Sequence, residues 1–156
     1  MKKYIIIFIT SLLCLNITAQ TTNITINYGN SVYFYFNALP KYQSGITYNN
    51  YTQLNLYYEH TVGSTWTLSV KAMSNEISGS GTNFLDLNHL EIQAETGGVP
   101  YTAPVPLSNA NQIIASGILS STSENIIIDI TYSIGTSGLM GEIPDFYFVD
   151  LEYTLE

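Results

Sequence analysis

The chain has 156 residues, of which 46% are hydrophobic and only 10% are charged, and its formal net charge is −8. Four Lys and Arg residues against twelve Asp and Glu exclude nucleic acid as a partner, because nucleic-acid binding depends on basic side chains that neutralise phosphates. The same deficit argues against docking on an anionic membrane surface.

The first element along the chain has the layout of a secretory signal peptide. Residues 1–3 form a short basic segment, and an apolar run from Tyr4 to Leu15 follows. That run is too short to span a bilayer, and the chain turns polar directly after it. We expect cleavage after Ala19, so that residues 1–19 are the signal peptide and residues 20–156 form a single β-sandwich domain.

Other fates of this segment stay open. Cleavage after Gln20 and an uncleaved anchor are alternatives, and Cys14 raises a lipoprotein signal, although Leu13 stands where a small residue is usual. Removal of residues 1–19 leaves 137 residues without cysteine, and two lysines against twelve carboxylates give −10. We therefore expect a protein secreted to the periplasm, cell surface or extracellular space, without direct membrane insertion after processing, that is stabilised by core burial alone.

Alternating apolar and polar residues predict the strands of the first half. Residues 22–28 and 32–36 form the first two, residues 42–51 read as a connecting loop, and residues 54–58 form the third. The clearest pattern runs over residues 65–72, where Trp66, Leu68, Val70 and Ala72 point to one face and polar residues to the other. This segment is predicted to be a central core strand, paired in a hairpin with the third strand because their separation is short.

The second half contains more irregular stretches. Residues 75–83 read as a loop, and an irregular turn precedes a strand over residues 89–94. Three prolines and two glycines make residues 97–107 a surface excursion or an edge. Further strands are predicted at residues 112–115, 125–134 and 146–155, and no helical period is sustained anywhere.

Seven to nine short strands separated by turn signals predict an all-β fold. The expected architecture is an antiparallel two-sheet β-sandwich, immunoglobulin-like or pilin-like. A closed β-barrel is the alternative. The predicted structural core contains the inward residues of two strands: Trp66, Leu68, Val70, Tyr147, Val149, Leu151 and Tyr153.

The sequence contains no recognisable catalytic set. His60 and His89 lack the three or four convergent ligands that a zinc site needs. Asp150 and Glu152 lie on one face of the last predicted strand, and paired carboxylates in a cleft hydrolyse glycosides. We predict that the protein is not an enzyme, with a glycan-active enzyme that uses this surface carboxylate pair as the alternative.

No cofactor is predicted, and calcium is the one that stays open. A regular Asp-x-Asp-x-Asp-Gly calcium loop is absent from the sequence. Asp86 with Asn88, or Glu142 with Asp145, are carboxylate and amide groups on loops that could join an irregular calcium site.

Tyrosines are the remaining candidates for binding. Tyr33 and Tyr35 share a face of the second predicted strand, and Tyr57 shares one with Asn55 and Gln53. Tyrosine rings stack on sugars and anchor protein partners, so Tyr33, Tyr35 and Tyr57 are the candidate binding residues. The alternative is that these rings cover a sheet face and pair across strands.

Several segments resemble small exported β-sandwich proteins of bacterial surfaces, and the chain is similar to the WxL domain. The segments are residues 42–46, Trp66-Thr67-Leu68, residues 85–92 and residues 147–155. Trp66-Thr67-Leu68 stands as the first WxL motif, and Tyr153-Thr154-Leu155 takes the place of the second, with Tyr153 where the family has tryptophan. The resemblance implies an extracellular, wall-associated, non-catalytic module.

Together these observations predict a secreted, non-catalytic module of the cell surface with a structural, adhesive or binding role. Its expected partner is a cell-wall polymer, a glycan or a surface protein.

Overall fold

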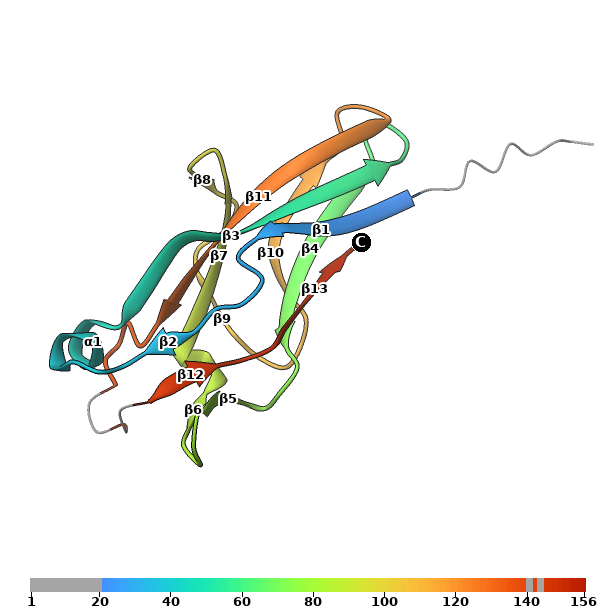
Figure 1. The fold of residues 1–156 in the computed structure, drawn as a ribbon. Helices are drawn as coiled ribbons and strands as arrows, with labels where there is room; N and C mark the ends of the chain where they lie inside the picture. The colour runs from blue at the N-terminus through green and yellow to red at the C-terminus, as the bar shows by residue number, and fades with distance from the viewer. Residues whose placement is uncertain (1–20, 140–141, 143–144) are drawn as a thin grey trace, which may run out of the picture.

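The computed structural model describes residues 21–139, 142 and 145–156, so the predicted signal peptide lies outside the described residues. The regular secondary structure of this part of the chain is nearly all β-strand, arranged as antiparallel sheets in two layers, and the sheets do not close into a barrel (Figure 1). The predicted all-β, antiparallel sandwich is thereby confirmed. In the part of the chain that the structure describes, no helix is long and apolar enough to cross a membrane.

The first layer is a six-stranded sheet in the order β1-β3-β11-β7-β8, with β9 also paired to β7. Its strands are β1 (Thr21–Tyr28), β3 (Ile46–Glu59), β7 (Leu90–Thr96), β8 (Val99–Pro100), β9 (Val105–Pro106) and β11 (Ser123–Ile134). In the second half of each of the long strands β3 and β11, buried residues alternate with more exposed ones. This alternation gives the sheet one face for the core and one for solvent.

The second layer consists of two smaller sheets. Residues 65–79 and residues 146–155 each contribute one strand to both of these sheets. One has the order β10-β4-β13 and the other β2-β12-β5-β6. Their strands are β2 (Phe34–Tyr35), β4 (Thr65–Ala72), β5 (Glu76–Gly79), β6 (Phe84–Asp86), β10 (Gln112–Ile118), β12 (Phe146–Phe148) and β13 (Leu151–Leu155). The pair β4–β13 leads into the pair β5–β12, and the backbone N–H of Met73 donates to Asp150 O across the break at 2.9 Å.

The core lies between the layers and draws on both. The Tyr58 ring of β3 lies 6.0 Å from the Trp66 ring of β4, centroid to centroid, so the largest core side chains meet across the two layers. Trp66 is only 3% exposed. Of the residues predicted for the core, Trp66, Leu68, Val70 and Tyr147 are buried, whereas Val149, Leu151 and Tyr153 are partly buried against it.

The predicted hairpin between the third strand and the Trp66 strand is wrong. Strand β3 belongs to the first layer and β4 to the second, so the chain crosses between layers at residues 60–64. That crossing is hydrogen-bonded to the link between β10 and β11, which also passes from one layer to the other. His60 N donates to Thr122 O and Gly63 N donates to Leu119 O. The two strands therefore bring their apolar faces together across the core, and do not pair edge to edge.

Two predicted loops also need correction. Residues 42–51, read as a loop, contain the end of a short helix α1 (Leu39–Ser44) and the start of β3. Pro40 lies in the first turn of α1, where its missing N–H costs nothing. Residues 75–83, also read as a loop, contain β5, whose Ile77 is fully buried and so favours strand pairing.

The last predicted strand is in fact two. Residues 146–155 divide into β12 and β13, which lie in different sheets on either side of Val149 and Asp150. In all, the described residues form thirteen strands, more than the seven to nine expected, because β5, β6, β8 and β9 lie in stretches read as loops or irregular turns and the last predicted strand divides in two. A single-turn 3₁₀ helix (Leu87–His89) separates β6 from β7.

Candidate functional site: an aromatic face and the pocket beside it

Four aromatic rings cover the outer side of β2 and β12, and we call them the aromatic face: Tyr33, Tyr35, Phe146 and Phe148. Antiparallel register places Tyr35 opposite Phe146, and their rings lie parallel, within 4°, with centroids 3.9 Å apart. Tyr33 lies 6.5 Å from Phe148 in a tilted contact. Strand alternation turns the residues between them, Phe34 and Tyr147, into the core, where both are buried.

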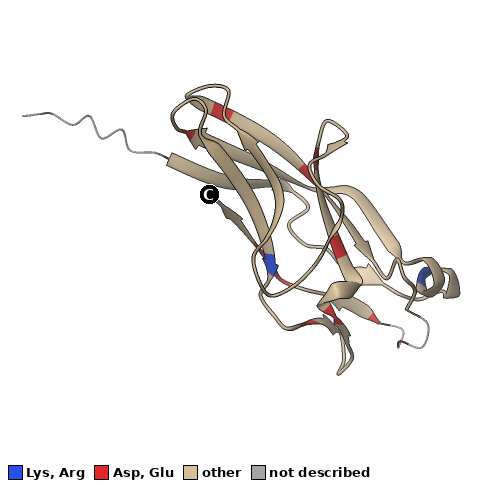
Figure 2. Ribbon diagram, turned by 180° about the vertical axis from the view of Figure 1, so that it is seen from behind, with Lys and Arg blue, Asp and Glu red and all other residues tan. Residues whose placement is uncertain are grey.

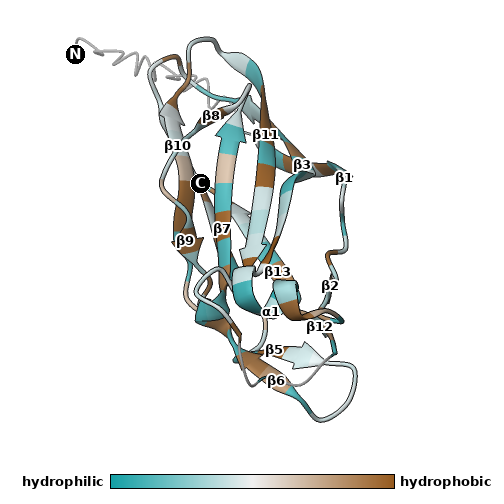
Figure 3. Cartoon of the chain, turned by 90° about the vertical axis from the view of Figure 1, so that its left-hand side faces the viewer, coloured by the Kyte–Doolittle hydropathy of each residue, from teal (hydrophilic) through white to brown (hydrophobic). Residues whose placement is uncertain are grey.

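The aromatic face is exposed to solvent in this chain. Its rings are 58%, 40%, 47% and 40% exposed for Tyr33, Tyr35, Phe146 and Phe148. Strands β2, β12, β5 and β6 lie together at one end of the molecule, where Figure 3 shows hydrophobic segments. A contiguous group of large apolar side chains on a surface is typical of an interaction site.

Hydrogen bonds on both sides hold this face in place. The Lys41 ammonium donates to Tyr35 O and to Asn37 Oδ1, each at 2.9 Å, and lies 5.6 Å from the centre of the Tyr35 ring. Phe36 N donates to Asp145 O at 3.1 Å, which joins the end of β2 to the start of β12. The rings are thereby presented on a supported backbone.

Asp145 anchors the start of β12. Its carboxylate accepts hydrogen bonds from the Ser80 hydroxyl, from the Asn83 amide at 3.0 Å and from the backbone N–H of Phe146 at 2.7 Å. These bonds stabilise the charged form and lower the pKa of Asp145 to about 2. Gly79 leaves the space for this group, because a Cβ there would lie 2.5 Å from Asp145 Oδ2.

A pocket of about 180 Å³ adjoins the aromatic face. It opens between the link from β1 to β2 and the link from β12 to β13, and Tyr33 and Phe148 belong to both pocket and face. The lining residues are Ile26, Gly29, Asn30, Ser31, Val32, Tyr33, Thr52, Tyr132, Phe148, Val149, Asp150, Leu151 and Tyr153.

Side-chain hydroxyls hold one wall of the pocket. Residues 29–33 belong to no strand, yet three alternate carbonyls accept hydrogen bonds. Thr52 donates to Gly29 O, Tyr51 to Ser31 O at 3.2 Å and Tyr48 to Tyr33 O at 3.3 Å. All three donors come from β3, so its side chains replace the backbone hydrogen bonds that a neighbouring strand would provide.

A chain of hydroxyl groups lies beneath the pocket. Tyr132 Oη lies 2.9 Å from Thr52 Oγ1 and 2.8 Å from Tyr153 Oη. Each hydroxyl has one proton, and that of Thr52 goes to Gly29 O. Tyr132 therefore donates to Thr52, and Tyr153 donates to Tyr132. Burial raises the pKa of both tyrosines, so both keep their protons at neutral pH.

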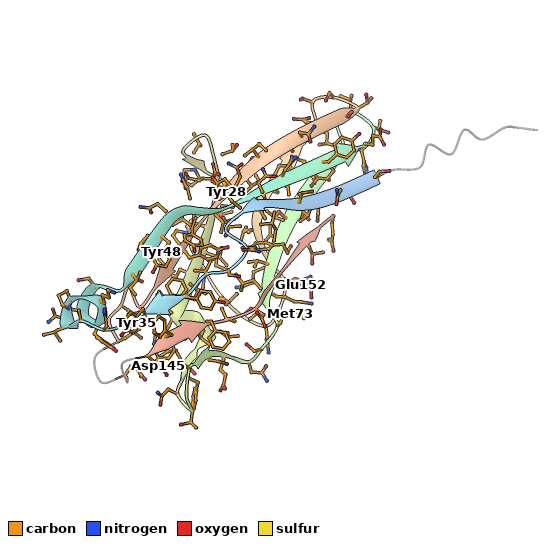
Figure 4. All side chains as sticks on the ribbon, viewed as in Figure 1. Tyr28, Tyr35, Tyr48, Met73, Asp145 and Glu152 are labelled. Atoms are coloured by element: carbon orange, nitrogen blue, oxygen red, sulfur yellow. The ribbon has the colours of Figure 1, made fainter. Side chains whose placement is uncertain are left out.

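Asp150 is the single charged residue among those that line the pocket. The neighbouring carboxylate of Glu152 is bound instead to the Lys71 ammonium, at 3.0 Å. Figure 2 shows the acidic positions spread over several elements and the two described lysines on separate ones, α1 and β4. Figure 4 places Glu152 beside Met73, and Tyr35 and Asp145 at the end that carries β2 and β12.

The other candidate residues lie elsewhere. Tyr57 is on β3, in the first layer, where its hydroxyl accepts a hydrogen bond from Ser123 Oγ at 3.3 Å, so the structure separates it from Tyr33 and Tyr35. His60 packs against the Tyr58 ring, and His89 lies at the end of the 3₁₀ helix. Among the described residues, no group of three or more His, Cys, Asp or Glu side chains is placed to hold a metal ion.

Phe146 and Phe148 are functional candidates that the sequence analysis missed. Their signal was present: they flank Tyr147 in a period of two, so a buried Tyr147 puts both of them on the outer face. The pocket has no such signal, because its residues come from four separate stretches of the chain: residues 26–33, Thr52, Tyr132 and residues 148–153.

The two WxL-like segments lie on neighbouring strands. Strand β4 pairs with β13, with Leu155 opposite Leu68 and Tyr153 opposite Val70. Thr67 and Glu156 exchange two backbone hydrogen bonds at 2.8 and 3.0 Å. Membership of the WxL family stays a prediction.

No protein-family model matches the chain, and no curated protein does so either. Among solved structures, a family 123 glycoside hydrolase from Clostridium perfringens, described for glycolipid glycan hydrolysis, aligns at 13% identity with a TM-score of 0.42. The alignment covers 87% of this chain but only 25% of the hydrolase. TmCBM61 in complex with beta-1,4-galactotriose aligns at 13% identity with a TM-score of 0.31, over 86% of this chain and 87% of that one. At 13% identity and TM-scores of 0.42 and 0.31, neither structure indicates what this chain binds.

Proposed function

We propose that the protein is an exported, non-catalytic module of the cell surface that binds a glycan through the aromatic face. The observation that carries this proposal is the group of exposed rings on β2 and β12, with Tyr35 stacked parallel on Phe146 at 3.9 Å. Exposed aromatic rings offer apolar surface to the C–H groups of a sugar, and tyrosine hydroxyls add polar contacts at the edge. The proposed location rests on the export signal predicted for residues 1–19.

The surroundings of the face favour a glycan over a protein partner. The rings are followed directly by a polar pocket with a hydroxyl chain beneath it and one carboxylate at its lining. A protein hot spot is instead an apolar centre surrounded by a ring of other side chains that exclude water. A row of rings that leads into a hydrogen-bonding pocket matches a ligand with alternating apolar and polar surfaces.

The carboxylates of the aromatic face and its pocket support a binding role without chemistry. Glycoside hydrolysis needs two carboxyl groups about 5–10 Å apart on either side of the bond. In the described part of the chain, Glu152 is bound to Lys71 and Asp145 is held by Ser80 and Asn83. Asp150 alone faces the pocket.

Retention on insoluble polysaccharides tests the proposal. The chain without residues 1–19 is mixed with purified cell-wall polymer and with a panel of neutral and acidic polysaccharides, and the bound fraction is measured. We expect at least one polymer to retain the protein, and the double variant Tyr35→Ala/Phe146→Ala to lose about tenfold or more in affinity, because the stacked pair is removed.

Tyr57→Ala is the matched control, since it removes a tyrosine ring from the first layer, away from the face. It should bind like the unaltered chain. Unchanged retention of the double variant, with its melting temperature preserved, would show that the face does not bind. Binding to intact cells that persists after removal of their glycans, and is lost after protease treatment, would assign the face to a protein partner.

A further inference from the structure

We infer that the pocket beside the aromatic face binds the terminal sugar of a neutral glycan chain, an inference that rests on the proposed function. A cavity of about 150 Å³ is large enough to hold benzene, so the pocket of about 180 Å³ admits one six-membered ring. Tyr33 and Phe148 line both pocket and face, so the next sugars along the chain continue over the aromatic rings.

The floor of the pocket limits entry to a chain end. Thr52 is 1% and Tyr132 2% exposed, and they are joined by a hydrogen bond of 2.9 Å. Tyr153 closes the same floor through its bond of 2.8 Å to Tyr132. A polysaccharide cannot thread through these side chains, so a sugar ring enters the pocket from its open side, as the last ring of a chain can.

The polar groups of the pocket suit a ligand with hydroxyl groups. The protons of Tyr153, Tyr132 and Thr52 are committed along the hydroxyl chain that ends at Gly29 O, so none of the three has a proton left for a ligand. The Asp150 carboxylate is also an acceptor without a proton. A sugar O–H group can donate to this carboxylate, and the Asn30 amide and the Ser31 hydroxyl of the same lining can donate to sugar oxygens.

Charge excludes acidic sugars from the pocket. Asp150 is its only charged lining residue, so a ligand carboxylate or sulfate would be repelled by a like charge. The two lysines of the described chain are engaged elsewhere, Lys71 with Glu152 and Lys41 with Tyr35 O and Asn37. We therefore expect neutral sugars to bind and uronic acids to be rejected.

Nuclear magnetic resonance titration with free monosaccharides tests the pocket without the polymer. The isotope-labelled chain without residues 1–19 is titrated with galactose, glucose, mannose, N-acetylglucosamine and glucuronic acid. We expect at least one neutral sugar to shift the amide signals of residues 29–33 and 148–153, and glucuronic acid to leave them unchanged. Asp150→Asn, which keeps the size of the side chain and removes its charge, should weaken the neutral sugar about fivefold or more, because a charged acceptor is lost.

Tyr57→Ala is the matched control, because Tyr57 lies on β3 and lines neither the pocket nor the aromatic face; its shifts on monosaccharide addition should equal those of the unaltered chain. Polymer retention that depends on Tyr35 and Phe146, without any monosaccharide shift at the pocket, overturns this inference and leaves the proposed function standing. If monosaccharides shift the signals of the pocket but polymer retention is unchanged in Tyr35→Ala/Phe146→Ala, the proposed role of the aromatic face is contradicted and the pocket remains a sugar-binding site. Tighter binding of glucuronic acid than of every neutral sugar overturns the selectivity.

Discussion

The hydroxyl groups of Tyr132 and Tyr153 lie 2.8 Å apart and join the two layers of the sandwich. Tyr132 belongs to β11 of the first layer and Tyr153 to β13 of the second. Because Tyr132 gives its proton to Thr52, Tyr153 is the donor in this bond. The two residues therefore have unequal roles, although they are the same amino acid in one contact.

Removal of the Tyr132 hydroxyl should cost more stability than removal of the Tyr153 hydroxyl. Tyr132→Phe leaves the Tyr153 O–H without its acceptor inside the protein, and an unsatisfied buried polar group costs about 1–3 kcal/mol. Tyr153→Phe leaves Tyr132 still bonded to Thr52, so the loss should be about 0.5–1.5 kcal/mol. Urea unfolding of both variants measures the difference.

The double variant Tyr132→Phe/Tyr153→Phe completes the cycle. It should be less destabilised than the two single changes added together, since no donor is left stranded. Strict additivity, or a larger loss for Tyr153→Phe, would contradict the order of donation inferred for this hydroxyl chain.

Tyr58→Phe should raise stability. The Tyr58 hydroxyl is buried and has no hydrogen-bond partner among the described residues, while its ring packs 6.0 Å from Trp66. Burial raises the pKa of Tyr58 far enough to keep it neutral. Loss of the hydroxyl removes a desolvation cost and keeps the ring, so we expect a gain of about 1 kcal/mol in the free energy of unfolding. A clear loss in urea unfolding would mean that the hydroxyl has a partner after all.

Trp66 and Gly117 should be coupled. A Cβ at Gly117 would lie 2.8 Å from Trp66 Nε1, so Gly117→Ala forces the ring to move and should cost about 1–3 kcal/mol. Trp66→Ala should cost about 3–5 kcal/mol, because it empties part of the core. In the double variant the added methyl group at position 117 no longer meets the indole ring. The loss in the free energy of unfolding should therefore be smaller than the sum of the two single losses.

Fluorescence follows the same site directly, since the chain has one tryptophan. Native emission should be blue-shifted and should move to the red on unfolding, as expected for a side chain that is 3% exposed. Red-shifted emission from the folded protein would place Trp66 at the surface.

Asp145 should make stability depend on pH in the acid range. Hydrogen bonds lower its pKa from 3.8 to about 2 in the folded protein. A carboxyl with a depressed folded pKa contributes stability above its unfolded pKa and loses that contribution as the pH falls toward the folded value. The advantage in melting temperature of the unaltered chain over Asp145→Asn should therefore be constant above pH 5 and shrink between about pH 4 and pH 2. A constant difference down to pH 2 would show that the carboxylate is not held by Ser80 and Asn83.

Local pattern was enough to predict the fold class and the inward faces of the strands. The period of two over residues 65–72 identified β4 and its buried face, and the same period identified β11 and Tyr147. This works because side chains alternate between the faces of a strand, and a chain of this composition must bury its apolar face.

Tertiary structure alone decided which strands pair and what the exposed rings form. The short link at residues 60–64 reads as a hairpin turn, yet it crosses between layers because it bonds to Leu119 and Thr122. Residues 146–155 keep one alternation but change sheets at Asp150. The aromatic face and the hydroxyl chain from Gly29 to Tyr153 join residues far apart in sequence. Pairing and convergence depend on contacts between distant segments, and a one-dimensional periodicity records which way a side chain points without recording what it meets.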